Sequence, residues 1–204
     1  MTRYATAVLL TALSSVALAQ ATNPPTNPPV RVRGTVEKLE NNVMTVKAAD
    51  GKAVDVKLAD NYTVVGVAKA RIADIGEGKY IGTTTLGERN GALSALEVHI
   101  FPEAMRGVGE GHYAWDLKPD SKMTNGNVAE VKSVGKDHML TVQYKGGEQK
   151  VLVPGNAKVV LFGPGERSEL KKGAHIFVVA QRQPDGSLSA ARVNVGMKGT
   201  VPPM

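Results

Sequence analysis

Hydrophobic and polar residues alternate along most of the chain, and short glycine- or asparagine-containing pairs interrupt the alternation. After Asp50-Gly51, valine or leucine occupies every second position from Val54 to Leu58. A period of two is typical of a strand with one buried face, and Asp-Gly is typical of a tight hairpin turn. Asn41-Asn42 and Asn90-Gly91 predict two further turns. Between residues 30 and 100 the pattern predicts about five or six short strands and one brief turn or helical element near residue 73.

The order of features in residues 30–100 recurs in residues 128–197. Met44-Thr45-Val46 matches Leu140-Thr141-Val142, at an offset of 96 residues. Near the end of each segment, residues 90–95 (NGALSA) match residues 185–190 (DGSLSA), at an offset of 95. A single loop deletion would account for the difference. The sequence therefore predicts two copies of one small domain.

Short strands in this number predict an all-β fold of two tandem small barrels, each OB-like and closed or nearly closed. A pair of small β-sandwiches is the alternative, because strand spacing alone does not distinguish the two. The sequence contains no cysteine. Each copy, at roughly 65–70 residues, must therefore be held together by core burial without disulfides. Aromatic residues make up only 4% of the chain, so the expected cores are aliphatic.

The first residues have the features of an export signal. Arg3 supplies the positive start, and the apolar stretch from Ala5 to Val16 is shorter than the roughly 20 residues of a membrane span. Small residues permit cleavage after Ala19 or Ala21, so residues 1–21 are predicted to be a signal peptide. The protein is expected to be periplasmic or secreted, with no stable membrane span. Residues 22–29 form a proline-rich leader that favours extended backbone.

The charge pattern argues against nucleic acid as the partner. The formal net charge is +6, and the basic residues are scattered rather than grouped in runs. Proteins that bind single strands stack bases on aromatic side chains over a basic groove, and aromatic residues are scarce here. The expected partner is therefore an envelope protein or a small ligand, and the oligomeric state stays open.

Residues 101–127 match neither repeat, and residues 198–204 form a short tail. The segment 101–127 contains the single tryptophan, which a flexible spacer would not need, so we expect an ordered connector. Residues 106–117 read RGVGEGHYAWDL and resemble a linker in a group of uncharacterised exported bacterial proteins that have tandem OB-like domains of unknown function. The resemblance covers about 20 residues and implies a location and a fold, but no activity. The candidate residues for binding a ligand or partner are Arg106, Glu110, His112, Trp115 and Asp116.

Two roles are open for this connector. It could fill the gap between the barrels, with Trp115 and Met123 as packing residues. Alternatively it could frame a site. The sharpest version of that hypothesis is a Cu(I) site formed by Met105, His112 and Met123, with His99 as a further candidate, because thioether and imidazole ligands suit Cu(I).

Catalysis has weaker support. Ser121, His112 and Asp116 contain the residue types of a hydrolytic triad, but no nucleophile-elbow motif accompanies them. The sequence thus predicts an exported, non-enzymatic binding or interaction protein of the cell envelope. A periplasmic Cu(I) carrier or sensor is the alternative.

Overall fold

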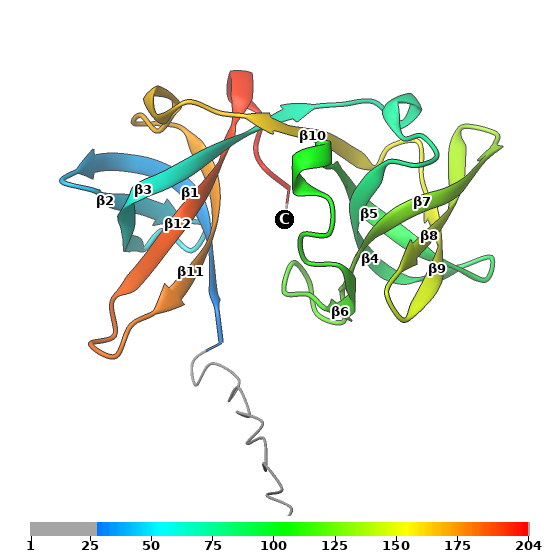
Figure 1. Ribbon diagram of the computed structural model, residues 1–204, viewed down its shortest axis with the longest axis horizontal. Coiled ribbons are helices and arrows are strands. Elements are labelled where there is room, and N and C mark those ends of the chain that lie inside the picture. Colours follow the sequence, from blue (N-terminus) through cyan, green and yellow to red (C-terminus); the bar gives the residue numbers. More distant parts are fainter. Residues whose placement is uncertain (1–27, 204) are drawn as a thin grey trace, which may run out of the picture.

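The computed structural model describes residues 28–203, and nearly all of its regular structure is β-strand (Figure 1). The predicted all-β class is confirmed. The predicted signal peptide and most of the leader lie outside the described residues. The strands are β1 (Val30–Glu40), β2 (Val43–Ala48), β3 (Ala53–Lys69), β4 (Tyr80–Arg89), β5 (Ala92–Ile100), β6 (Gly111–Ala114), β7 (Lys122–Val134), β8 (Asp137–Tyr144), β9 (Gly147–Val153), β10 (Lys158–Pro164), β11 (His175–Arg182) and β12 (Leu188–Gly196). Four short 3-10 helices are interspersed: η1 (Ile72–Asp74), η2 (Glu103–Met105), η3 (Arg167–Glu169) and η4 (Met197–Gly199).

The strands form one continuous sheet that closes on itself twice. In the first barrel, β1 pairs with β2 and β11, β2 pairs with β3, and β12 closes the ring between β11 and β3. In the second barrel, β7 pairs with β4 and β8, β8 pairs with β9, and β5 closes the ring between β4 and β9. The closing contacts β12–β3 and β5–β9 are both parallel. Figure 1 shows the two barrels side by side.

Neither barrel is built from one repeat alone, which differs from the tandem arrangement expected from the sequence. The first barrel takes three strands from residues 30–100 and its last two, β11 and β12, from residues 128–197. The second barrel takes β7, β8 and β9 from the later segment and β4 and β5 from the earlier one. The physical reason is visible in β3, which continues for 17 residues and carries the chain out of the first barrel. The two segments therefore exchange their final hairpins.

A short antiparallel ladder between β3 and β10 joins the barrels. Val67 lies opposite Phe162, and Val65 and Lys69 lie opposite Pro164 and Val160. Val65 and Val160 are 95 positions apart, as are Lys69 and Pro164, so the pairing is symmetric about its centre. The buried side chains of this bridge, together with Phe177 of β11, form a hydrophobic cluster between the two barrel cores.

The barrel cores are aliphatic, as the composition predicts. The first is filled by buried residues such as Val36, Met44 and Val178, and the second by residues such as Ile81 and Leu140. Full burial of one such side chain contributes about 1.5–3 kcal/mol. Closure also leaves few unpaired sheet edges, which removes a source of aggregation.

The predicted asparagine turns are confirmed. Asn41 and Asn42 both have positive φ, as do Asn90 and Gly91. Two successive residues with positive φ match the twist of a two-residue hairpin, and asparagine and glycine adopt this conformation most readily. Among residues 28–203, no helix has the length and apolarity needed to cross a membrane.

The strand exchange can be tested by cross-linking, because the chain contains no native cysteine. Lys57 of β3 pairs with Ser189 of β12, whereas an unexchanged chain would place Ser94 there, 95 positions earlier. We predict that the double variant Lys57→Cys/Ser189→Cys forms an intramolecular disulfide, detected by peptide mapping, since Cα atoms of paired strands lie within disulfide range. Lys57→Cys/Ser94→Cys is the control. A disulfide in the control and not in the test variant would disprove the exchange.

Candidate functional site

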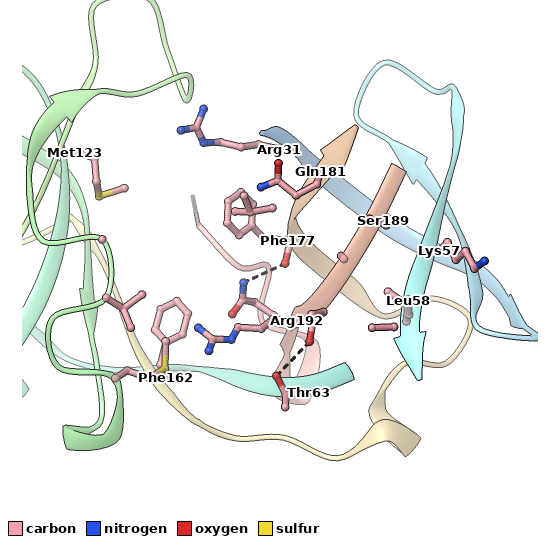
Figure 2. Close-up of a pocket in the computed structure, with 18 of the residues that line it drawn as sticks. Arg31, Lys57, Leu58, Thr63, Met123, Phe162, Phe177, Gln181, Ser189 and Arg192 are labelled. Atoms are coloured by element: carbon pink, nitrogen blue, oxygen red, sulfur yellow. Dashed lines mark hydrogen bonds between the residues drawn. The ribbon is translucent and has the colours of Figure 1, made fainter. Parts of the chain in front are cut away.

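A groove with a volume of about 1230 Å³ lies between the two barrels. Figure 2 shows side chains from both barrels and from the bridge lining it. Its volume is somewhat larger than the roughly 300–1,000 Å³ typical of clefts that hold small molecules. Because the exchanged strands hold the barrels together from one side only, the opposite side of the space between them stays open.

The outer face of the first barrel forms one wall. Successive strand residues point to opposite faces, so Val178 is buried in the barrel core while Phe177 and Val179 face outward to the groove. Arg31 of β1 is paired with Val179 and points the same way, and Arg192 follows on β12. This wall combines an apolar centre with cationic side chains at its sides.

Aromatic residues and methionines form the floor and the second wall. The rings of Phe101 and Phe162 have centroids 4.9 Å apart, and Phe162 belongs to the bridge. Trp115 of the connector lies 6.4 Å from Phe177, centroid to centroid. Met105 and Met123 also line the groove. The lining is therefore mostly apolar, with cations on one side.

The predicted connector is ordered, and its first part is fixed to the second barrel. The Arg106 guanidinium donates hydrogen bonds to Glu103, to the side chain of Asn127 and to the carbonyl of Gly78. The Glu110 carboxylate accepts a hydrogen bond from the backbone N–H of Lys145 at 3.0 Å. Both candidate residues thus hold the connector in place.

A buried tyrosine also holds the connector against the second barrel. The Tyr80 hydroxyl donates to the carbonyl of Val108 at 3.1 Å. Burial, with the nearby carboxylate of Glu110, raises the pKa of Tyr80 to about 12, so the hydroxyl remains a donor across the physiological range.

The second part of the connector reaches the first barrel. Arg33 donates to both carboxylate oxygens of Asp116, at 2.7 and 3.2 Å, and Arg31 lies 3.8 Å from the same carboxylate. The Arg31 guanidinium also lies 4.0 Å above the ring of Trp115, which is a cation–π contact. Burial raises the pKa of Asp116, but the bond to Arg33 and the charges of both arginines outweigh it and leave the pKa lowered. The connector therefore ties the two barrels together across the groove.

The structure places one of the predicted Cu(I) ligands, His112, apart from the others. His112 lies opposite Thr124 in the β6–β7 pair, with Nδ1 2.9 Å from the threonine hydroxyl, and its ring stacks on Tyr144. Met123 is the next position along β7, so its side chain points to the other face and lines the groove with Met105. His112 does not line that groove. The structure thus separates His112 from Met105 and Met123, whereas His99, the further candidate, lines the same groove as the two methionines. Within residues 28–203 there is also no cluster of three or more His, Asp or Glu side chains arranged to hold a metal.

Sequence reasoning missed a buried polar cluster on β5. The Glu97 carboxylate is 2% exposed, accepts a hydrogen bond from Thr84 at 2.6 Å and lies 3.1 Å from Nε2 of His99. Burial raises the pKa of Glu97, but the contact with His99 and the bond from Thr84 outweigh it, and the net effect is a lowered pKa. His99 lines the groove, with its ring 5.7 Å from that of Phe162. One acidic and one basic side chain are thus paired on the outer face of the second barrel, because Val98 between them points into the barrel core.

The arginine and phenylalanine wall was also missed. Arg31, Phe177 and Arg192 are distant in sequence, and the exchange of hairpins brings them together. One signal was present, because residues 176–180 (IFVVA) are a continuous apolar run, in contrast to the alternation between Val54 and Leu58. Such a run indicates a strand covered on both faces.

Comparison with protein family models, curated proteins and solved structures finds no match to this chain.

We predict that Asp116→Asn loosens the connector. The loss of the charged bond to Arg33 should expose Trp115 and shift its fluorescence to longer wavelength, at a cost of at most about 1 kcal/mol because the pair is partly exposed. In the wild type the lowered pKa means that the tie holds above the ordinary aspartate pKa, about 3.9, and is lost as the pH falls below it. Asp120→Asn, an exposed change in the same loop, is the control. Equal shifts in both variants would contradict the assignment.

We predict that Glu97→Gln lowers the free energy of unfolding by about 2 kcal/mol at neutral pH, because His99 loses a charged partner inside the protein. Since the pKa of Glu97 is lowered by folding, this contribution is present above the ordinary glutamate pKa, about 4.3, and disappears in acid. Urea unfolding at both pH values measures the difference. The exposed Glu37→Gln variant should match the wild type, and a pH-independent difference would rule out the charged pair.

Proposed function

We propose that the protein is an exported, non-enzymatic binding protein whose ligand lies in the groove between the barrels. The observation that carries the proposal is the groove itself, with about 1230 Å³ of space lined by apolar side chains from both barrels and the bridge. Each barrel already has a closed core of its own. Val108 and Val179, which line the groove and are 41% and 43% exposed, are therefore available to contact a ligand. Concave apolar sites with a few polar groups are typical of small-molecule binding.

The barrels are proposed to be OB-like. In each ring the strands follow the order first, second, third, fifth, fourth, and the third and fifth are parallel. This order and the closed five-strand ring support an OB-like barrel over a sandwich. The ligand site proposed here, however, is the space between two barrels and not the face of one. Export is inferred from the signal-like residues 1–21 alone.

The connector supports a binding role. Its polar residues Arg106, Glu110 and Asp116 are engaged in bonds that fix the two barrels relative to one another. A groove of fixed width is preorganised, and preorganisation reduces the entropy lost when a ligand binds. A small ligand is favoured over an envelope protein because the apolar surface lies within the groove.

The test uses phenylnaphthylamine, a neutral apolar dye whose fluorescence rises in apolar surroundings. We predict saturable binding to the wild type, with a matching change in the emission of Trp115, the only tryptophan in the chain. Ala191→Phe places a large side chain in the groove and should weaken binding at least about tenfold, since it removes space for the ring system.

Ala129→Phe is the matched control, because Ala129 is exposed on β7 and outside the groove lining. It should bind the dye within about twofold of the wild type, a change well under the 1.4 kcal/mol that corresponds to tenfold. No binding to the wild type, or equal binding to the two phenylalanine variants, would refute the proposal.

A further inference from the structure

We infer that the ligand of the groove is a small organic anion, with an apolar body on the aromatic floor and a carboxylate or sulfonate held by Arg192 and Arg31. The inference rests on the proposed function of the groove as a binding site and adds the chemical class of the ligand. It is carried by the placement of charges on the wall of the first barrel.

The two arginines flank an apolar patch. Arg31 pairs with Val179 in the β1–β11 ladder, and Asn194, two residues after Arg192, pairs with Phe177 in the β11–β12 ladder. Neighbouring strands lie about 4.8 Å apart, so the backbones of β1 and β12 are separated by about 10 Å. In Figure 2 both guanidinium groups project from the first barrel towards the second, on either side of Phe177. An acidic group can reach these cations while its apolar part contacts the ring.

Arg192 has no counterion in the part of the chain that the structure describes. Between residues 28 and 203 its side chain makes no ion pair and no hydrogen bond, although it lines the groove. The neighbouring arginines differ, since Arg33 holds both oxygens of Asp116 and Arg31 contacts the same carboxylate. The wall therefore already binds one carboxylate of the chain itself and leaves a cation free beside it.

The groove lining as a whole has more positive than negative side chains. Arg31, Lys57 and Arg192 are its cations, and Asp185 is the acidic residue among the described residues that line the groove. Asp185 is ionised and held by the backbone and hydroxyl groups of Ser187 in the β11–β12 turn, so it balances one of these three cations. Charge complementarity therefore favours an anion.

The apolar surroundings strengthen this preference. A neutral ligand that fills the groove removes water from Arg192 and gives the guanidinium nothing in return, which is unfavourable. An acidic group replaces the lost water with a charge-assisted hydrogen bond, and the bond is stronger where water is excluded.

The experiment compares two dyes that share one ring system, with the chain otherwise intact. Phenylnaphthylamine is neutral, and anilinonaphthalene sulfonate is the same molecule with a sulfonate added. We expect the wild type to bind the sulfonate about tenfold more tightly, measured by dye fluorescence and by the emission of Trp115. Arg192→Gln should abolish this preference and should not weaken the binding of the neutral dye, which no longer removes water from a cation. Arg192→Lys should keep most of the preference, and added salt should reduce it.

Arg89→Gln is the matched control, since it removes one exposed arginine that does not line the groove and changes the net charge equally. Equal affinities for the two dyes, or equal losses in Arg192→Gln and Arg89→Gln, would overturn the inference and leave groove binding intact. If neither dye binds the folded wild type, the proposed function itself fails and the inference fails with it.

Discussion

The antiparallel pairing of β3 with β10 is the constraint on which the rest of the structure depends. Because of this pairing, the chain leaves the first barrel after three strands. Each ring then closes with a hairpin from the other repeat, β11–β12 in the first barrel and β4–β5 in the second. The same few residues supply the buried contact of Val67 with Phe162 and the floor of the groove. A chain that closed each barrel locally would lose this ladder and its buried side chains. The exchange is therefore stabilised by contacts that exist only in the exchanged state.

A single bridge on one side would leave the relative orientation of the barrels weakly determined. The connector supplies the second point of attachment, with Arg106 held to the second barrel and Asp116 to Arg33 of the first. Two attachments on different sides of the groove fix its width, whereas either one alone would permit hinge motion. This explains why a segment outside both repeats contains the tryptophan and several of the charged contacts. Its residues were predicted as candidate binding residues, and their contacts make them positioning residues of the groove.

The sequence was sufficient for the local features and insufficient for the long-range ones. Asn90-Gly91 and Asn41-Asn42 predict their turns because turn conformation depends on the two residues themselves. Strand exchange has no comparable signal in the sequence. The final hairpins of the two segments have similar patterns of hydrophobic and polar residues, so either hairpin could pair with β1 or with β7. The separation of His112 from Met123 has a related reason. Short spacing between His112 and Met123 does not place them on one face when they lie in neighbouring register positions of paired strands.

The two repeats differ in charge at one pair of equivalent positions in their parallel strand pairs. Thr63 pairs with Arg192 in the first barrel, and Lys158 pairs with Glu97 at the equivalent position of the second, 95 residues apart in each strand. Glu97 is buried and satisfied by His99 and Thr84, so its charge adds rigidity to that barrel and offers little to a ligand. Arg192 is exposed to the groove and has no counterion among residues 28–203. Glu97 does not line the groove, so its charge does not enter the charge balance of the lining. The difference between these two positions therefore leaves Arg192 as an unpaired cation that adds to the positive charge of the groove, whereas the carboxylate at the equivalent position of the second barrel is held by hydrogen bonds within the chain.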